Sequence, residues 1–151
     1  MTHGPIQVSE RGEEFAAVVR GHATEVELPA FLGGAFGEVI EELRKQGVAV
    51  TGPPFGRYWP AGEGFEVEAG FPAAGSVAPA GRVVPSVLPA GAVATTVHEG
   101  GYAGLGQSYS EVEQWLPAHG YAATDAPWES YLDGPEVPEP RTRISFPCVA
   151  A

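Results

Sequence analysis

Two stretches of the chain, GEVIEELRKQGVAVTGPPFGRYW (Gly37–Trp59) and SEVEQWLPAHGYAATDAPWESYL (Ser110–Leu132), share one pattern that decides the fold. Aligned without gaps at an offset of 73 residues, they have eight identical positions, where chance would give roughly one or two. The identities in the first stretch are Glu38, Val39, Leu43, Gly47, Ala49, Thr51, Pro54 and Tyr58. Because an accidental match of two amphipathic helices does not explain the later Thr, Pro and Tyr, we interpret the chain as two copies of one unit.

Each copy contains one predicted amphipathic helix. The first helix is expected from about Leu28 to Gln46 and the second from about Gly104 to His119. Apolar residues recur at spacings of four, three and four, which places them on one face of a helix. These residues are Leu32, Phe36, Val39 and Leu43 in the first helix, and Leu105, Tyr109, Val112 and Leu116 in the second. Gly47 and Gly120 then end the helices, where a positive φ is favoured.

Predicted strands surround each helix in pairs. In the first copy they are Pro5–Val8, Phe15–His22, Pro54–Trp59 and Phe65–Phe71, and in the second Arg82–Leu88, Ala92–His98, Pro127–Leu132 and Thr142–Phe146. The pattern predicts an α+β fold: a duplicated strand–strand–helix–strand–strand unit with antiparallel sheet, pseudo-twofold symmetry and a ligand cleft between the halves. We expect a single domain over residues 1–151, with repeat 1 at about 5–72, a linker at about 72–81 and repeat 2 at about 82–148. A loop is expected at Asp133–Pro140.

Composition narrows the function. Eight Lys and Arg against 19 Asp and Glu give a net charge of −11, which argues against nucleic acid and anionic membranes as partners. The single Cys148 forms no internal disulfide, and the four histidines lack the spacing of metal ligands, so we expect no metal and no cofactor. There is no run of about eighteen apolar residues, and no secretory signal is recognised, so a soluble cytoplasmic protein is the expectation.

The two copies differ at one position that bears on function. Strand alternation places Glu129 and Tyr131 on one side of their strand, whereas the matching positions in the first copy are Gly56 and Tyr58. One half thus offers a carboxylate, and the other leaves room for a ligand. A carboxylate among aromatic rings suits flat cationic molecules, because ring faces attract cations by about 0.5–2 kcal/mol. The alternative is a glutamate that faces solvent on a half-exposed strand.

Three motifs resemble the family of GyrI-like small-molecule-binding domains. They are Pro127–Leu132 followed by an Asp-Gly-Pro loop and a strand ending in Phe-Pro, His98-Glu99-Gly100-Gly101-Tyr102 before a helix, and Phe65-Glu66-Val67-Glu68 through Phe71-Pro72. The resemblance covers nearly the whole chain. It implies a duplicated α/β unit, also found as the effector-binding half of AraC- and MerR-type regulators, which binds hydrophobic, often cationic aromatic compounds with a central glutamate. By motif position that glutamate is Glu129. Since the chain lacks a helix-turn-helix segment, it resembles the stand-alone members.

Further ring-bearing residues are candidates for the walls of the site. Tyr58 and Tyr131 flank Glu129 and carry hydroxyls that can bond its carboxylate; the alternative is that they are core tyrosines. Tyr102 is expected at the mouth between the halves, or as a packed loop residue. Trp59 and Phe65 are expected at the rim. Trp128 is included as a wall residue, although simple alternation turns it to the other side, where it would pack in the core.

These residues leave three hypotheses open. The first is a multidrug-binding protein that sequesters or senses bulky hydrophobic, cationic aromatic compounds and contributes to drug resistance. The second is an enzyme, a cyclopropanoid cyclopropyl hydrolase, in which Glu129 acts as general base and Tyr131 or Tyr58 as hydrogen-bond donor. The third, inhibition of a protein such as DNA gyrase, has weak support because the acidic residues form no long run. The natural ligand, the oligomeric state and any regulatory protein partner stay open.

Overall fold

A computed structural model describes residues 2–134 and 136–151, so residue 135 of the predicted loop lies outside the described residues. The described part of the chain is α+β, with antiparallel sheet and two α-helices. It divides into two compact units. The central unit is Glu13–Pro89, and the terminal unit combines Met1–Gly12 with Ala90–Ala151.

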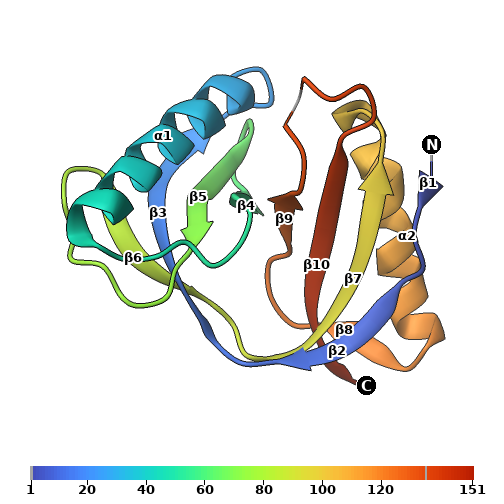
Figure 1. Ribbon diagram of the computed structural model, residues 1–151. Helices are drawn as coiled ribbons and strands as arrows, with labels where there is room; N and C mark the ends of the chain where they lie inside the picture. Colours follow the sequence, from blue (N-terminus) through green and yellow to red (C-terminus); the bar gives the residue numbers. More distant parts are fainter. Residues whose placement is uncertain (1, 135) are drawn as a thin grey trace. The chain divides into compact units, whose positions relative to one another are not determined.

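The central unit is an antiparallel sheet with one helix against it (Figure 1). Its strands have the order β4-β5-β3-β6. The elements are β3 (Glu14–Ala23), α1 (Leu28–Gln46), β4 (Phe55–Pro60), β5 (Phe65–Pro72) and β6 (Val83–Leu88). The helix α1 has the predicted bounds, begins with Pro29 in its first turn and ends at Gly47, whose φ is 69°. It buries Ala35, Val39 and Leu43 against apolar side chains of β3 and β5.

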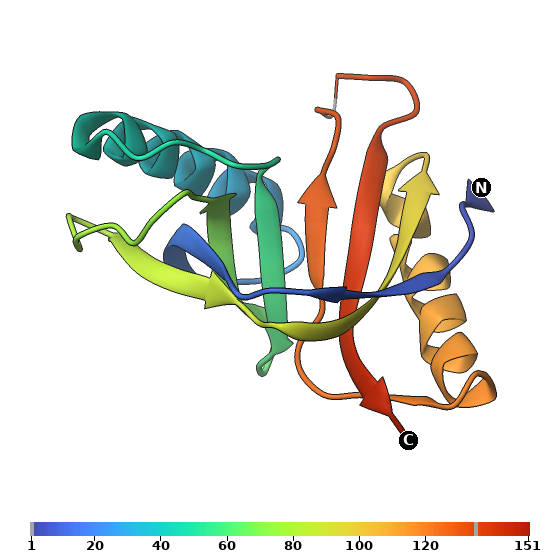
Figure 2. The ribbon, with the colours of Figure 1, turned by 60° about the horizontal axis from the view of Figure 1, so that its bottom comes forward.

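The terminal unit has the same kind of construction. Strands β1, β7, β10 and β9 follow one another in the sheet, while β2 also pairs with β7 and β8 with β10. The elements are β1 (Thr2–His3), β2 (Gln7–Arg11), β7 (Gly91–Glu99), the 3₁₀-helix η1 (Tyr102–Gly104), α2 (Leu105–Ala118), β8 (Tyr121–Ala123), β9 (Trp128–Tyr131) and β10 (Arg141–Ala150). Figure 2 shows α2 beside the strands of this unit, where Val112 and Leu116 pack on Ile144 and Phe146.

The two helices bury matching positions. The buried residues of α2 are Ser108, Val112 and Leu116, each 73 positions after a buried residue of α1. Gly47 directly follows α1, and Gly120, which has a φ of 80°, comes after the C-cap residue His119 of α2. The helix stripes predicted from the sequence therefore face the cores of their own units.

Each compact unit contains one strand that the sequence analysis assigned to the other repeat. The strand β6, expected to open repeat 2, pairs with β3 of the central unit from Val19↔Val83 to Glu14↔Leu88. The strand β2, expected in repeat 1, pairs with β7 of the terminal unit. Antiparallel pairing between distant segments determines this assignment, and spacing along the chain does not reveal it.

The predicted linker, residues 72–81, packs on the central unit. Ala73 and Val77 belong to its core, with 3% and 4% of their surfaces exposed. At the end of α1, the amide of Gln46 donates to the carbonyl oxygen of Ala78 and accepts from its N–H, both at 2.9 Å. These contacts fix the segment that leads into β6.

Candidate functional site

The short strand β9 places the key carboxylate of the terminal unit. It pairs with β10 in a register that sets Glu129 opposite Ile144 and Tyr131 opposite Thr142. Directly opposite residues of antiparallel strands project to the same side of the sheet. Ile144 packs against α2, so Glu129 and Tyr131 lie on the face that the helix covers. Trp128 and Ser130 alternate to the other side, as their burial pattern indicates.

Two tyrosines hold the carboxylate of Glu129. The hydroxyl of Tyr109, on α2, donates to Oε2 at 2.6 Å, and the hydroxyl of Tyr131 donates to Oε1 at 2.8 Å. Each carboxylate oxygen therefore accepts one hydrogen bond from a phenol. Tyr109 also packs edge-on against Phe146, with ring centroids 5.6 Å apart. The site thus joins the helix to two strands of the sheet.

Burial makes this carboxylate unusual. Desolvation raises the pKa of Glu129 above its ordinary value, and the hydrogen bonds from Tyr109 and Tyr131 and the Coulombic effect of His98 oppose the rise without cancelling it. The ionised form is consequently poorly hydrated. A cation placed beside the carboxylate would stabilise its negative charge, which water solvates poorly here.

Tyr102 lies beside this pair at the start of the helical segment. It belongs to η1, is 41% exposed, and its ring meets that of Tyr131 edge-on at a centroid distance of 6.2 Å. Burial raises the pKa of Tyr102, and the carboxylates of Glu136, Glu129 and Asp133 raise it further. The surroundings of its hydroxyl are therefore electronegative. Such a field favours cations.

A buried histidine ties the Tyr102 segment to the helix. His98, on β7, is 1% exposed; its Nδ1 lies 2.8 Å from the Ser108 hydroxyl and its Nε2 lies 3.1 Å from the carbonyl oxygen of Gly101. The carbonyl can only accept, so a proton on Nε2 donates to it. The imidazole thereby fixes the backbone just before η1.

The central unit carries the other predicted wall residues. Tyr58 and Phe65 meet edge-on at 5.9 Å, and the guanidinium of Arg57 lies 5.1 Å from the centroid of the Trp59 ring. This unit does not repeat the carboxylate site. A Cβ at Gly56 would overlap the Tyr58 hydroxyl, and Phe36 stands where α2 has Tyr109. The roles of Tyr58, Trp59 and Phe65 as ligand walls stay predictions.

The structure places Trp128 in a packed setting. Its side chain is 1% exposed, and the guanidinium of Arg11 lies 5.5 Å from its ring centroid. Alternation directs it away from the face that carries Glu129. The packing interpretation of Trp128 therefore has the better support, and no bulge in β9 reverses it.

Sequence reasoning did not assign Tyr109 to the site. It treated this residue only as part of the apolar stripe of the second helix. The available signal was the comparison of the two copies: Tyr109 has a hydroxyl where Phe36 has none, and it matches the change from Gly56 to Glu129. The hydroxyl of Tyr109 and the carboxylate of Glu129 thus occur together in the second stretch, and the matching positions of the first stretch carry neither group.

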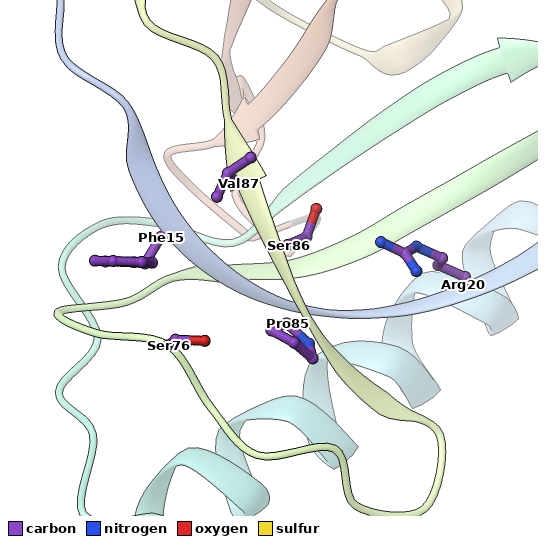
Figure 3. Close-up of a pocket in the computed structure, with 6 residues that line it drawn as sticks. All are labelled: Phe15, Arg20, Ser76, Pro85, Ser86 and Val87. Carbon is purple, nitrogen blue, oxygen red and sulfur yellow. The ribbon is translucent and has the colours of Figure 1, made fainter.

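A separate shallow hollow of about 260 Å³ lies on the central unit beside β6 (Figure 3). It is lined by Phe15, Arg20, Ser76, Pro85, Ser86 and Val87. Arg20 and Ser86 both donate to the carboxylate of Glu68, at 2.7 and 2.8 Å. None of the predicted site residues lines this hollow.

Two classes of site receive no support. Among residues 2–134 and 136–151, no group of three His, Cys, Asp or Glu side chains is arranged to hold a metal ion. Neither helix of the described chain combines the length and apolar character needed to cross a bilayer.

Comparisons with known proteins identify the family. Residues 17–148 match the GyrI-like small molecule binding domain. This match covers most of the chain, and the protein therefore belongs to the GyrI-like family, as its motifs predict. No curated protein is significantly similar to it in sequence.

Solved structures share the fold. The crystal structure of the EcmrR C-terminal domain is 23% identical over all of both chains, with a TM-score of 0.84. The EcmrR chain in a cryo-EM structure of an EcmrR–DNA complex is 24% identical, with a TM-score of 0.82; the alignment covers 99% of this chain and 58% of that longer one. SAV2435 bound to tetraphenylphosphonium is 14% identical, with a TM-score of 0.68 and coverage of 97% and 94%. A hydrolase from Listeria innocua is 13% identical, with a TM-score of 0.70 and coverage of 95% and 91%.

Proposed function

We propose that this small-molecule-binding domain binds bulky hydrophobic cations that carry aromatic rings. The observation that carries the proposal is the partly buried carboxylate of Glu129, held by two tyrosine hydroxyls at 2.6 and 2.8 Å, with a pKa that desolvation raises. The hydrogen bonds fix the position of the carboxylate, and a lipophilic cation would neutralise it at a small desolvation cost of its own.

Aromatic surface supplies the second part of the recognition. The rings of Tyr102 and Tyr131 lie next to Glu129, and each suitably placed ring face would attract a cation by about 0.5–2 kcal/mol. The acidic surroundings of Tyr102 would raise the local concentration of cations. Binding of tetraphenylphosphonium by SAV2435, a structural neighbour, supports this ligand class. The difference between the two stretches also supports it, because Gly56, at the position that matches Glu129, leaves room for a ligand.

The test is a titration of the purified protein with a panel of cationic aromatic dyes, followed by tryptophan quenching. We expect micromolar-range binding that Glu129→Gln weakens at least several-fold. The control is Glu113→Gln, which makes the same charge change on the exposed side of α2. Equal dye affinity in wild type and Glu129→Gln would exclude Glu129 as the counter-ion.

A second candidate function is hydrolysis of strained, cyclopropane-bearing alkylating compounds. It is favoured by the raised pKa of Glu129, which suits a general base, and by two phenol donors in contact with it. The structural likeness to a Listeria innocua hydrolase is consistent with it. Incubation with a strained electrophilic cyclopropane should then give ring-opened product over many turnovers. Stoichiometric binding without product would exclude the enzyme.

A further inference from the structure

A buried histidine connects two tyrosines of the candidate site. The Nδ1 atom of His98 lies 2.8 Å from the hydroxyl oxygen of Ser108, and its Nε2 lies 3.1 Å from the carbonyl oxygen of Gly101. Ser108 directly precedes Tyr109, and Gly101 directly precedes Tyr102. One imidazole ring is thus within hydrogen-bond distance of both segments that carry these tyrosines.

The histidine itself belongs to a more distant strand than the carboxylate. His98, on β7, lies opposite Thr142 of β10, and Thr142 lies opposite Tyr131 of β9. Two strand spacings of about 4.8 Å each therefore separate the backbones of His98 and Tyr131. Since β10 lies between the strand of the histidine and the strand of the carboxylate, we expect His98 to act on a ligand through the residues that it bonds.

The backbone in front of Tyr102 depends on the bond from the histidine. The carbonyl oxygen of Gly101 accepts from the N–H of Gly104 at 3.1 Å, which closes the turn of η1, and it also lies within reach of Nε2 of His98. Gly100, just before it, has a φ of 119°, a conformation that favours glycine. Glycine backbone has many accessible conformations, so a hydrogen bond at Gly101 restricts the direction in which η1 carries the Tyr102 ring.

The helix-on-sheet construction does not by itself require this link. Ser108 and Ala35 occupy matching positions of α2 and α1, and they are 4% and 0% exposed. The central unit therefore packs its helix with a methyl group at this position, and a methyl group forms no hydrogen bond to a histidine. The hydroxyl of Ser108 occurs in the unit that carries Glu129, as the hydroxyl of Tyr109 does.

We propose that His98 is a positioning residue of the cation site. Through its hydrogen bond to Gly101 it holds the ring of Tyr102 edge-on against the ring of Tyr131. The serine hydroxyl at Nδ1 fixes the plane of the imidazole. The inference rests on the proposed function, because it assumes that a ring-bearing cation binds at Glu129.

Two conservative variants each keep one of the two contacts. The amide of glutamine is as many bonds from Cβ as Nε2 of histidine, and the amide of asparagine corresponds to Nδ1. His98→Gln thus retains a donor for Gly101, whereas His98→Asn reaches only Ser108. In calorimetric titration with tetraphenylphosphonium, His98→Asn should bind roughly three- to tenfold more weakly than wild type, the range of a neutral hydrogen bond, and His98→Gln should stay within about twofold. The control is His119→Asn, on an exposed histidine, which should leave the affinity unchanged.

A second comparison separates positioning from stability. Each His98 variant loses one hydrogen bond, so both should lower the melting temperature to a similar extent. In a Tyr102→Leu background the two variants should bind tetraphenylphosphonium equally well, because the ring through which His98 acts is absent. Ser108→Ala leaves the histidine in place and introduces the residue that α1 has at Ala35. It should weaken binding when Tyr102 is present and have no effect in the Tyr102→Leu background.

The outcomes separate the two proposals. An equal affinity of His98→Asn and His98→Gln, or losses in His98→Asn and Ser108→Ala that are the same with and without Tyr102, overturns the inference and leaves the role of Glu129 intact. Equal binding of tetraphenylphosphonium by wild type and Glu129→Gln overturns the proposed function. Failure of tetraphenylphosphonium to bind wild type overturns both.

Discussion

Replacement of Tyr109 by phenylalanine tests the energetics of the buried carboxylate. The change removes one hydroxyl that donates to Glu129 at 2.6 Å and keeps the edge-on ring contact with Phe146. The chain itself carries phenylalanine at the matching position of α1, where Phe36 packs edge-on against Phe71 at 5.9 Å. The substitution therefore removes the hydrogen bond without changing the shape of the core.

The expected loss follows from the charge of the acceptor. A hydrogen bond to an ionised group contributes about 1.5–3 kcal/mol, so Tyr109→Phe should lower the free energy of unfolding by this amount at pH 7. For a chain of this length each kcal/mol lowers the melting temperature by roughly 2–4 °C, which predicts a drop of roughly 3–12 °C. Below about pH 4 the carboxyl is protonated in both states, and the loss should shrink to about 0.5–1.5 kcal/mol, the range of a neutral bond.

The assay is thermal and urea unfolding of four proteins: wild type, Tyr109→Phe, Glu129→Gln and the double variant. In the Glu129→Gln background the acceptor is neutral, so the effect of Tyr109→Phe should fall to about 1 kcal/mol. A loss that is the same in both backgrounds, or independent of pH, would refute a charge-assisted bond at Glu129.

Three further predictions concern the rest of the chain. Since the pKa of Glu129 is raised in the folded state, the stability that its carboxyl contributes is present below about pH 4.5 and is lost as the pH rises through the folded pKa. The melting temperature of Glu129→Gln, measured against pH, should lack this decline. The same pH dependence of the melting temperature in wild type and Glu129→Gln would contradict the prediction. A Cβ on Gly70 would overlap the carbonyl oxygen of Ala17, so Gly70→Ala should cost about 3 kcal/mol or more in urea unfolding, whereas Gly75→Ala, with nothing within 4 Å, should stay within about 0.5 kcal/mol. Cys148 is 3% exposed and burial raises the pKa of its thiol, so a disulfide reagent should modify the native protein far more slowly than the unfolded chain; equal rates would contradict this burial.

The sequence predicted the elements well where the signal is local. The stripe of α1 and the glycine at its end gave its bounds to the residue, and α2 differs by one residue at each end. The strand pairing is non-local, so the assignment of β6 to the central unit could not be read from the chain. The short strand β8 and the 3₁₀-helix η1 were missed because three residues carry too little periodicity.

Only the part of the candidate site that lies on one strand was predictable, because side-chain alternation along a strand is a local signal. Alternation along β9 indicated that Glu129 and Tyr131 share a side, and the hydrogen bond between them confirms it. Tyr109 reaches the carboxylate from another element, so only the comparison of the two copies could have identified it.

The central claim is that Glu129 is the counter-ion of a bound lipophilic cation, and proton release on binding tests it most directly. Tetraphenylphosphonium has a charge that does not titrate, and its binding should lower the raised pKa of Glu129. Calorimetric titration just above pH 4.5, in two buffers of different ionisation enthalpy, should therefore show release of protons by wild type and none by Glu129→Gln. Binding of tetraphenylphosphonium without proton release by wild type, or with the same release by both proteins, would contradict the claim.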